Sequence, residues 1–252
     1  MAGILLIDED SDTREQLAEI LSEAGYLVAT ACNGLEAAKS IVFMFNNVEP
    51  LERLRRAVGP DRCEFGFPTG FALLIDDKLR SSFTAPGQAV YVSNANWARV
   101  FREAKIPSIV EPDMESFWRT HAAFAIPLMA SGVVVYDRGA GITWSEAQRY
   151  ARALREGIAL VRRFGSKVTP RSVAFMAQLP GPLLTALLWG LNRTQIQREF
   201  GSMGPGEVSQ LIDAMERLAP GNAPTMLAIR PSAEPLERPR SSAARSGEVA
   251  LR

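Results

Sequence analysis

An uncharged run from Ala122 to Tyr136 constrains the fold of this chain more than any other stretch. The run follows a polar cluster, Trp118-Arg119-Thr120-His121, within the sequence FWRTHAAFAIPLMA. A long apolar run with a polar head indicates a buried helix that collects hydrogen-bonding side chains at its start. Because the run is shorter than the roughly 20 residues that cross a bilayer, we assign it to a protein core. Pro127 should kink this helix, since proline has no N–H to donate and crowds the preceding turn.

The composition indicates a globular protein without a strongly charged partner. The chain is 47% apolar and 22% charged, with a formal net charge of zero. This balance favours neither nucleic acid nor an anionic membrane surface as a partner. The sequence opens on a strand pattern followed by acidic residues, unlike a signal peptide, so we expect a cytoplasmic location. Cys32 and Cys63 lack the CxxC spacing of a metal or redox site, which favours buried free thiols.

The first 40 residues show a strand–helix–strand pattern. Ile4–Ile7 and Tyr26–Ala31 are short apolar runs, and apolar residues recur at helical spacing between them. Such a unit predicts a parallel strand pair with a crossover helix. Acidic residues, Asp8, Glu9 and Asp10, follow the first strand directly.

This opening, ILLIDEDSDTREQLAEILSEAGYLVATACNGLEAA, resembles a response-regulator receiver domain. The resemblance implies that Asp8 and Glu9 hold Mg²⁺, a hard cation that prefers oxygen ligands. In receivers the phosphorylated aspartate follows a third strand. The matching strand here, Ile41–Phe45, is followed by Asn46-Asn47 instead. The alternative is a solvated acidic loop at the end of the first strand.

A second resemblance covers residues 41–231. The stretch FWRTHAAFAIPL resembles the ketopantoate reductase (2-dehydropantoate 2-reductase) family, whose motif in one variant runs W-x-K-T-H-x-x-F-x-x-P. The resemblance implies an NADPH-dependent reductase of small 2-keto acids, as in pantothenate biosynthesis, with a homodimer as one possible assembly. It also implies an α/β first part and a helical second part.

The same resemblance implies four site residues. Arg119 stands where the family has its catalytic lysine, and Glu207 in GEVSQLID stands where the family has a catalytic glutamate. Asn46 and His121 are the implied substrate-binding residues. For each we keep a structural alternative open. Asn46 is then a strand-ending residue, Arg119 and Glu207 are an interhelical salt bridge, and His121 is a satisfied core or cap residue.

Two departures from the family put turnover in doubt. The dinucleotide fingerprint places glycines after the first strand, so that the backbone can approach a pyrophosphate. This chain has Asp8-Glu9-Asp10 there. Arginine, unlike lysine, is a poor proton donor because it stays protonated. We therefore expect a degenerate or inactive reductase that binds NADPH weakly or not at all.

The alternative is a response-regulator-like signalling protein with a receiver-type head on a reductase-derived body. Its N-terminal segment would then be a natural fusion, an engineered chimera or a rearranged gene.

The predicted fold is an α/β N-terminal part, a partial Rossmann or flavodoxin-like layer with parallel strands, joined to a mainly α-helical C-terminal domain. The predicted boundaries are 1–40 for the receiver-like segment, 41–112 for the reductase-like α/β part, 113–230 for the helical domain and 231–252 for a disordered tail. Alternating patterns predict antiparallel edge strands at Cys63–Phe67, Ala72–Ile75, Leu79–Thr84 and Ala89–Val92. A helix over Asn96–Ala104 and a strand over Ile106–Val110 should follow.

In the helical part, we expect helices over Trp144–Phe164, Pro170–Gln178, Gly181–Asn192 and Glu207–Leu218. Thr143 and Glu146 form a capping-box pattern before the first of these, and Asp113 is a good N-cap for the central helix. Pro170 should occupy the first position of its helix. The leucines around Trp189 favour a core position for this side chain.

Overall fold

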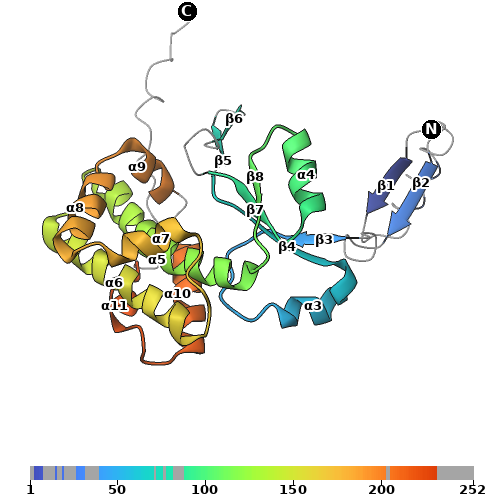
Figure 1. The fold of residues 1–252 in the computed structure, drawn as a ribbon. Helices are drawn as coiled ribbons and strands as arrows, with labels where there is room; N and C mark the ends of the chain where they lie inside the picture. Colours follow the sequence, from blue (N-terminus) through green and yellow to red (C-terminus); the bar gives the residue numbers. More distant parts are fainter. Residues whose placement is uncertain are drawn as a thin grey trace, which may run out of the picture. The chain divides into compact units, whose positions relative to one another are not determined.

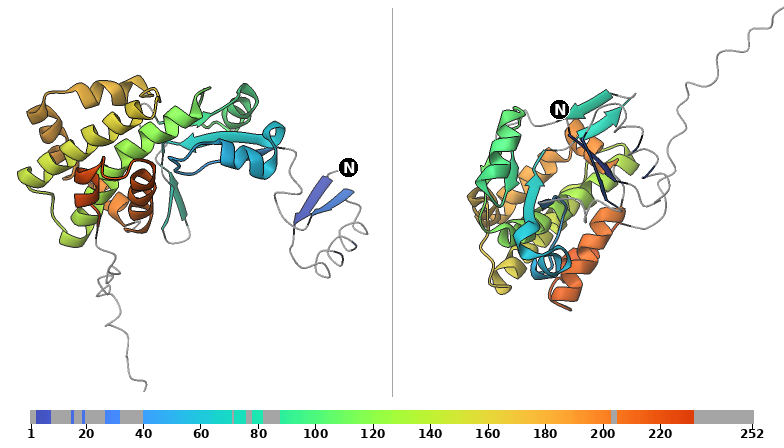
Figure 2. Two further views of the ribbon diagram at one scale, coloured as in Figure 1. Left: turned by 90° about the horizontal axis from the view of Figure 1, so that it is seen from below. Right: turned by 90° about the vertical axis from the view of Figure 1, so that its right-hand side faces the viewer.

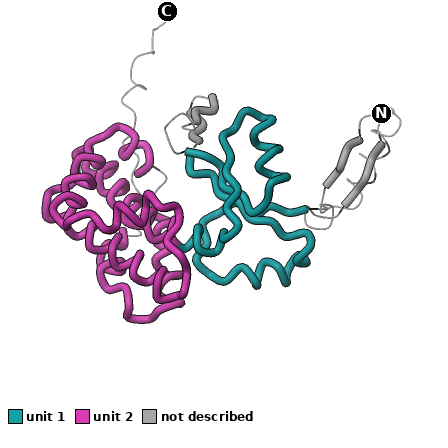
Figure 3. The backbone as a smooth tube through the Cα atoms, viewed as in Figure 1, with its two compact units in different colours: residues 1–119 teal, residues 120–252 magenta. Residues whose placement is uncertain are grey.

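The computed structural model describes residues 3–7, 15, 19, 27–31, 40–70, 72–75, 78–81, 88–202 and 205–231. The chain divides into two compact units, Met1–Arg119 and Thr120–Arg252 (Figure 3). The division falls inside helix α5 (Met114–Arg138), whose first turn and a half belongs to unit 1. The predicted tail from 232 onward lies outside the described residues.

The N-terminal strands confirm the predicted parallel pair. β1 (Gly3–Ile7) pairs with β2 (Leu27–Ala31) in parallel, in a register that runs from Gly3 opposite Leu27 to Ile7 opposite Ala31. Among the described strands these two pair only with each other. The predicted crossover helix lies mostly outside the described residues.

The main sheet of unit 1 has four strands in the order β3-β4-β7-β8 (Figure 1). They are β3 (Ile41–Phe43), β4 (Cys63–Pro68), β7 (Val90–Val92) and β8 (Ser108–Val110). β4 and β7 are antiparallel, whereas β3–β4 and β7–β8 are parallel. A further antiparallel hairpin joins β5 (Ala72–Ile75) and β6 (Lys78–Ser81). The predicted antiparallel pairs are confirmed, and the main sheet is mixed. The prediction that they are edge strands is wrong for β4 and β7, which are the two central strands of the main sheet.

Two helices and a short 3-10 turn connect the strands of the main sheet. α3 (Glu52–Val58) and the 3-10 turn η1 (Pro60–Arg62) connect β3 to β4, and α4 (Ala95–Glu103) connects β7 to β8. Asn94 caps α4, because its side-chain oxygen accepts from the Trp97 N–H at 3.1 Å. Capping by Asn94 explains why α4 begins one residue before the predicted Asn96.

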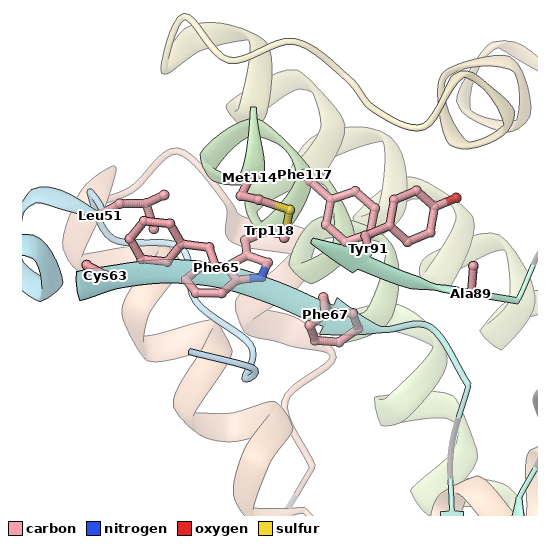
Figure 4. Packing of buried hydrophobic residues seen from close by; sticks show 9 residues of the cluster. All are labelled: Leu51, Cys63, Phe65, Phe67, Ala89, Tyr91, Met114, Phe117 and Trp118. Atoms are coloured by element: carbon pink, nitrogen blue, oxygen red, sulfur yellow. The ribbon is translucent and has the colours of Figure 1, made fainter. Parts of the chain in front are cut away.

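The first turn of α5 packs on the sheet. Phe117 and Trp118 are each 1% exposed, and the Trp118 indole donates to the Gly66 carbonyl at 3.1 Å. Figure 4 shows the cluster that they share with strands β4 and β7. Its members are Leu51, Cys63, Phe65, Phe67, Ala89, Tyr91, Met114, Phe117 and Trp118. Tyr91 stacks on Phe117 with ring centroids 4.4 Å apart.

Unit 2 consists of helices in the part that the structure describes (Figure 1; Figure 2). They are the rest of α5, α6 (Trp144–Arg163), α7 (Arg171–Gln178), α8 (Gly181–Leu191), α9 (Gln195–Gly201), α10 (Gly206–Leu218) and α11 (Pro224–Ala228). The mainly helical C-terminal part is therefore confirmed. The short helices α9 and α11 were not predicted.

The run from Ala122 forms the core of unit 2, as predicted. Ala122, Ala123, Ile126 and Val135 are completely buried. α5 continues through Pro127 to Arg138. At its start Asp113 caps the helix, accepting from the Ser116 N–H at 3.1 Å.

Of four further predictions, two hold and two are wrong. The capping box of Thr143 and Glu146 is present at α6, and Cys63 is a buried free thiol. Pro170 is the N-cap of α7 and not its first helical residue. Trp189 is 37% exposed rather than part of the core, because it falls on the outer face of α8.

No single helix among the described residues is long and apolar enough to cross a membrane. The bent pair of α7 and α8, which meet at 116°, passes the same test only when the two are taken together, by length and composition.

Candidate functional site

The six predicted site residues fall in three parts of the chain. Asn46 and Arg119 belong to unit 1, whereas His121 and Glu207 belong to unit 2. Asp8 and Glu9 lie outside the described residues. The structure thus brings Asn46 and Arg119 into one unit, and the pairing of Arg119 with Glu207 stays a prediction.

Arg119 is buried and engaged by two groups of unit 1. Its residue surface is 8% exposed, and its Nη2 lies 2.7 Å from Oε1 of Glu115, one helical turn earlier on α5. Its Nε–H donates to the Val48 carbonyl at 3.0 Å. A charge-assisted bond and a carbonyl bond together hold the guanidinium plane in place.

Arg119 and Glu115 connect the segment that follows β3 to α5 through hydrogen bonds. Oε2 of Glu115 accepts from the Leu51 N–H at 3.3 Å, so Glu115 bridges Arg119 and the start of α3. Asn47 forms a local turn in which its amide donates to the Glu49 carbonyl at 2.8 Å and its oxygen accepts from the Glu49 N–H at 3.2 Å. Asn46 lies directly before this turn and is half-buried.

Glu115 is a partner of Arg119 that the sequence analysis did not identify. It stands four residues before Arg119, the spacing at which a carboxylate and a guanidinium meet on one helix face. That spacing was visible in the sequence. The burial that makes the pair important was not, because it depends on Val48 and Leu51, which are far away in the chain.

His121 lies at the start of the unit 2 part of α5. Burial lowers the pKa of its imidazole to about 4, because desolvation disfavours the charged form. Its neighbour Thr120 is tied to the segment before α7, since its hydroxyl donates to the Lys167 carbonyl and accepts from the Thr169 N–H, both at 3.3 Å. His121 is therefore a neutral side chain near pH 7, able to donate or accept a hydrogen bond but not to offer a positive charge.

Glu207 is exposed in the first turn of α10, where a carboxylate interacts favourably with the helix dipole. This placement agrees with a helix-stabilising role and does not by itself indicate catalysis. Among the described residues, no group of three or more His, Cys, Asp or Glu side chains is placed to hold a metal ion. Burial raises the pKa of the Cys63 thiol, which marks it as an inert core residue.

No protein-family model matches the chain, and no curated protein matches it. Solved structures do. The complex of D-mandelate dehydrogenase with NADH has a TM-score of 0.56 and 10% sequence identity, covering 90% of this chain and 88% of that one. A 2-dehydropantoate 2-reductase from Porphyromonas gingivalis W83 has a TM-score of 0.45 and 14% identity, covering 91% of this chain and 71% of that one.

The likeness to D-mandelate dehydrogenase shows the fold. The chain has a dehydrogenase-like fold, with an α/β first part and a helical second part. Sequence identity this low says nothing about which residues of this chain are active.

The sequence that follows β1 differs from the dinucleotide fingerprint, and its residues 8–10 lie outside the part of the chain that the structure describes. In Rossmann-type folds the pyrophosphate lies at the turn that follows the first strand. Here β1 ends at Ile7, and the residues that follow it directly are Asp8, Glu9 and Asp10. Three carboxylates at this position would repel the phosphates. Without a glycine, the side chains would also keep the backbone away from them.

Proposed function

We propose that this chain is a degenerate 2-keto acid reductase, a dehydrogenase-fold protein that has lost nicotinamide-dependent turnover. The fold shared with D-mandelate dehydrogenase supports the first half of this proposal, since mandelate is a 2-hydroxy acid. The resemblance of residues 41–231 to ketopantoate reductases supports the same substrate class. The second half depends on what this chain has in place of the family's lysine and glycines.

The proposal depends mainly on the observation that Arg119 is already bonded to other groups of unit 1. A catalytic acid must give a proton to the carbonyl oxygen, and arginine does not lose its proton in proteins. Its guanidinium is also held by Glu115 at 2.7 Å and by the Val48 carbonyl at 3.0 Å. Arg119 thus stabilises unit 1 where a lysine would supply the proton.

The charges that follow β1 in the sequence add a second argument. One pair of like charges 4 Å apart costs roughly 4 kcal/mol at an effective dielectric of about 20, before screening. A quarter of that cost already lowers affinity several-fold, because about 1.4 kcal/mol is a factor of ten. The carboxylates of Asp8, Glu9 and Asp10 would each act in this direction against a pyrophosphate.

Isothermal titration of the full chain with NADPH, and separately with NADH, tests the proposal. We expect no binding at micromolar protein and no oxidation of NADPH with a panel of 2-keto acids. The Arg119→Lys variant is the matched control, because it restores the family's lysine and leaves Asp8, Glu9 and Asp10 unchanged. We expect this variant to be inactive as well. A dissociation constant in the low micromolar range would overturn the proposal.

A receiver-type signalling role is the second candidate. β1 and β2 form a parallel pair of their own among the described strands, and two candidate Mg²⁺ ligands follow β1 in the sequence. Incubation with acetyl phosphate and Mg²⁺ tests it. Phosphate incorporation that Asp8→Asn abolishes would favour the receiver role, and absence of incorporation would remove it.

A further inference from the structure

Helix α8 exposes a face without any polar side chain. At about 100° per residue, this face covers about 160° of the helix circumference. In order around the helix, its residues are Trp189, Pro182, Ala186, Gly190, Leu183 and Leu187. All six are exposed, Leu183 at 57% and Leu187 at 47%. The opposite side packs on α6 through Leu184, Thr185 and Leu188, which are buried. A helix that is apolar on both sides is expected to be covered on both sides, so the exposed face indicates a binding surface.

Helix α7 extends the apolar character of this region. It contains no buried residue, and Phe175 at its centre is 69% exposed. α7 and α8 are separated by Leu179-Pro180 and bend by 116°. Taken together, the two helices form a bent segment that is apolar in composition.

A cavity of about 360 Å³ opens at the edge of the α8 face. It is lined by Trp144, Gln148, Arg152 and Arg155 of α6 and by Pro182 and Thr185 of α8, among others. Arg155 donates to the Leu179 carbonyl, which fixes its guanidinium at the cavity. Arg152 is exposed and has no partner in the part of the chain that the structure describes. The cavity therefore offers two cations beside an apolar surface.

A third cation lies along the same edge. The Arg193 guanidinium is 3.4 Å from the centre of the Trp189 ring, and the Trp144 ring meets Trp189 edge to face at 6.3 Å. The sequence from Gly157 to Arg198 has no acidic residue at all, although it has several basic ones. These are Arg162, Arg163, Lys167, Arg171, Arg193 and Arg198.

The charge distribution decides between two occupants of this face. A second copy of the chain in a two-fold dimer would present the same patch to itself, with arginines at both rims. The two carboxylates of α6 are already engaged, Glu146 with Arg138 at 2.6 Å and Glu156 with the Met226 N–H at 2.8 Å. Like charges across an interface disfavour such a dimer. An anionic lipid surface offers acyl chains to the apolar face and phosphates to the arginines. Trp144 and Trp189 stand at the junction of the two, where tryptophan is favoured at membrane interfaces.

We propose that α7 and α8 bind the surface of an anionic phospholipid membrane. The apolar face of α8 enters the boundary between headgroups and acyl chains, and lipid phosphates pair with Arg152 and Arg155 at the cavity. The proposal departs from the expectation drawn from the zero net charge, because the charges are unevenly distributed along the chain. It does not depend on whether the chain binds NADPH.

Vesicle co-sedimentation of the full chain tests the proposal. We expect binding to vesicles that contain phosphatidylglycerol, little binding to vesicles of phosphatidylcholine alone, and release by salt. Leu187→Glu should abolish binding. Arg171 is exposed at the start of α7, one of the two helices of the proposed surface. Arg152→Gln with Arg171→Gln should weaken binding about thirtyfold, since each basic residue near an anionic surface contributes about a factor of five.

Two control variants make the same chemical changes in unit 1. Val100→Glu alters a side chain that is 48% exposed on α4, and Arg53→Gln with Arg56→Gln removes two charges from α3. Both should bind vesicles like the unaltered chain, and circular dichroism should show all variants folded. Absence of binding to phosphatidylglycerol vesicles, or equal losses in patch and control variants, would overturn the proposal. A dimer in sedimentation velocity that Leu187→Glu dissociates, without vesicle binding, would overturn it in favour of a second copy.

Discussion

At the scale of single residues, the role that the sequence resemblance implies for a side chain differs from the role that its contacts in the structure indicate. Arg119 stands at a catalytic position by resemblance, yet in the structure it joins α5 to the segment after β3. His121, the only histidine of the chain, is neutral because burial opposes its charge. In both cases the surroundings decide the role.

We expect Arg119→Ala to lower the free energy of unfolding by about 2–4 kcal/mol, because it leaves Glu115 and the Val48 carbonyl without their donor. Arg119→Lys should lower the free energy of unfolding by a smaller amount, since an ammonium does not reproduce the planar geometry of both bonds. Arg53→Ala is the control. It removes an exposed i,i+4 pair with Glu49 and should change stability by less than about 1 kcal/mol. Equal losses in urea denaturation would contradict the structural role of Arg119.

The pKa of His121 gives a pH prediction with a definite sign. The folded state holds the pKa at about 4, below the ordinary value of 6.5, so the unfolded chain binds the proton more readily between these values. Stability should therefore be highest above pH 6.5, fall as the pH decreases toward 4, and lose up to about 3 kcal/mol from this residue.

The His121→Gln variant should show a flatter dependence of unfolding free energy on pH in this range. Glu146, whose pKa is lowered to about 2 mainly by its hydrogen bond with Arg138, responds only below about pH 4.5, so the two effects separate. An unchanged pH dependence in His121→Gln would show that the imidazole is not desolvated in solution.

At the scale of elements, glycines determine where two helices of unit 2 come together. A Cβ placed on Gly201 of α9 would lie 2.0 Å from the Gly132 carbonyl oxygen of α5, which is backbone and cannot rotate away. Gly190 of α8, in contrast, has no heavy atom within 4 Å of such a Cβ. The same residue type is required at one position and replaceable at the other.

Gly201→Ala should destabilise the protein by at least about 2–3 kcal/mol, because the helices must move apart. Gly190→Ala should stabilise it by about 0.5–1 kcal/mol, since alanine has the higher helix propensity. Thermal denaturation of the two variants side by side measures both effects. A Gly201→Ala protein as stable as Gly190→Ala would show that α9 does not pack on α5 in this way.

At the scale of the whole molecule, the C-terminal end shows which part of the chain contributes to the core. α11 is short, but Met226 and Ile229 are 1% and 7% exposed, and Glu156 of α6 accepts from the Met226 N–H at 2.8 Å. The sequence after Pro231 has no aromatic residue and little apolar pattern. Composition of this kind does not form a packed core.

Truncation after Pro231 should therefore leave the melting temperature within a few degrees of that of the full chain. Truncation after Asn222, which also removes α11, should lower it clearly, because it uncovers the surface under Met226 and exposes apolar area to water. Differential scanning calorimetry of the two truncated proteins makes the comparison. A large loss in the first would show that the tail contributes to the fold.

Local patterns were sufficient for most elements. The parallel β1–β2 pair, the capping box at α6 and the buried run from Ala122 follow from neighbouring residues in the chain. The bounds of α6 and α8 agree with prediction within a residue. Hydrophobic period and capping are properties of a short segment, so a sequence contains them directly.

Long-range contacts had to be supplied by the tertiary structure. The sequence by itself determined a two-part fold, a core helix and the absence of glycines after β1. Only the folded chain decided that Arg119 pairs with Glu115 under the Val48 carbonyl, that α11 is buried, and that Trp189 faces outward. The physical reason is that burial depends on which distant segment covers a side chain, and an apolar helix such as α8 has the same sequence pattern whether one face or both are covered.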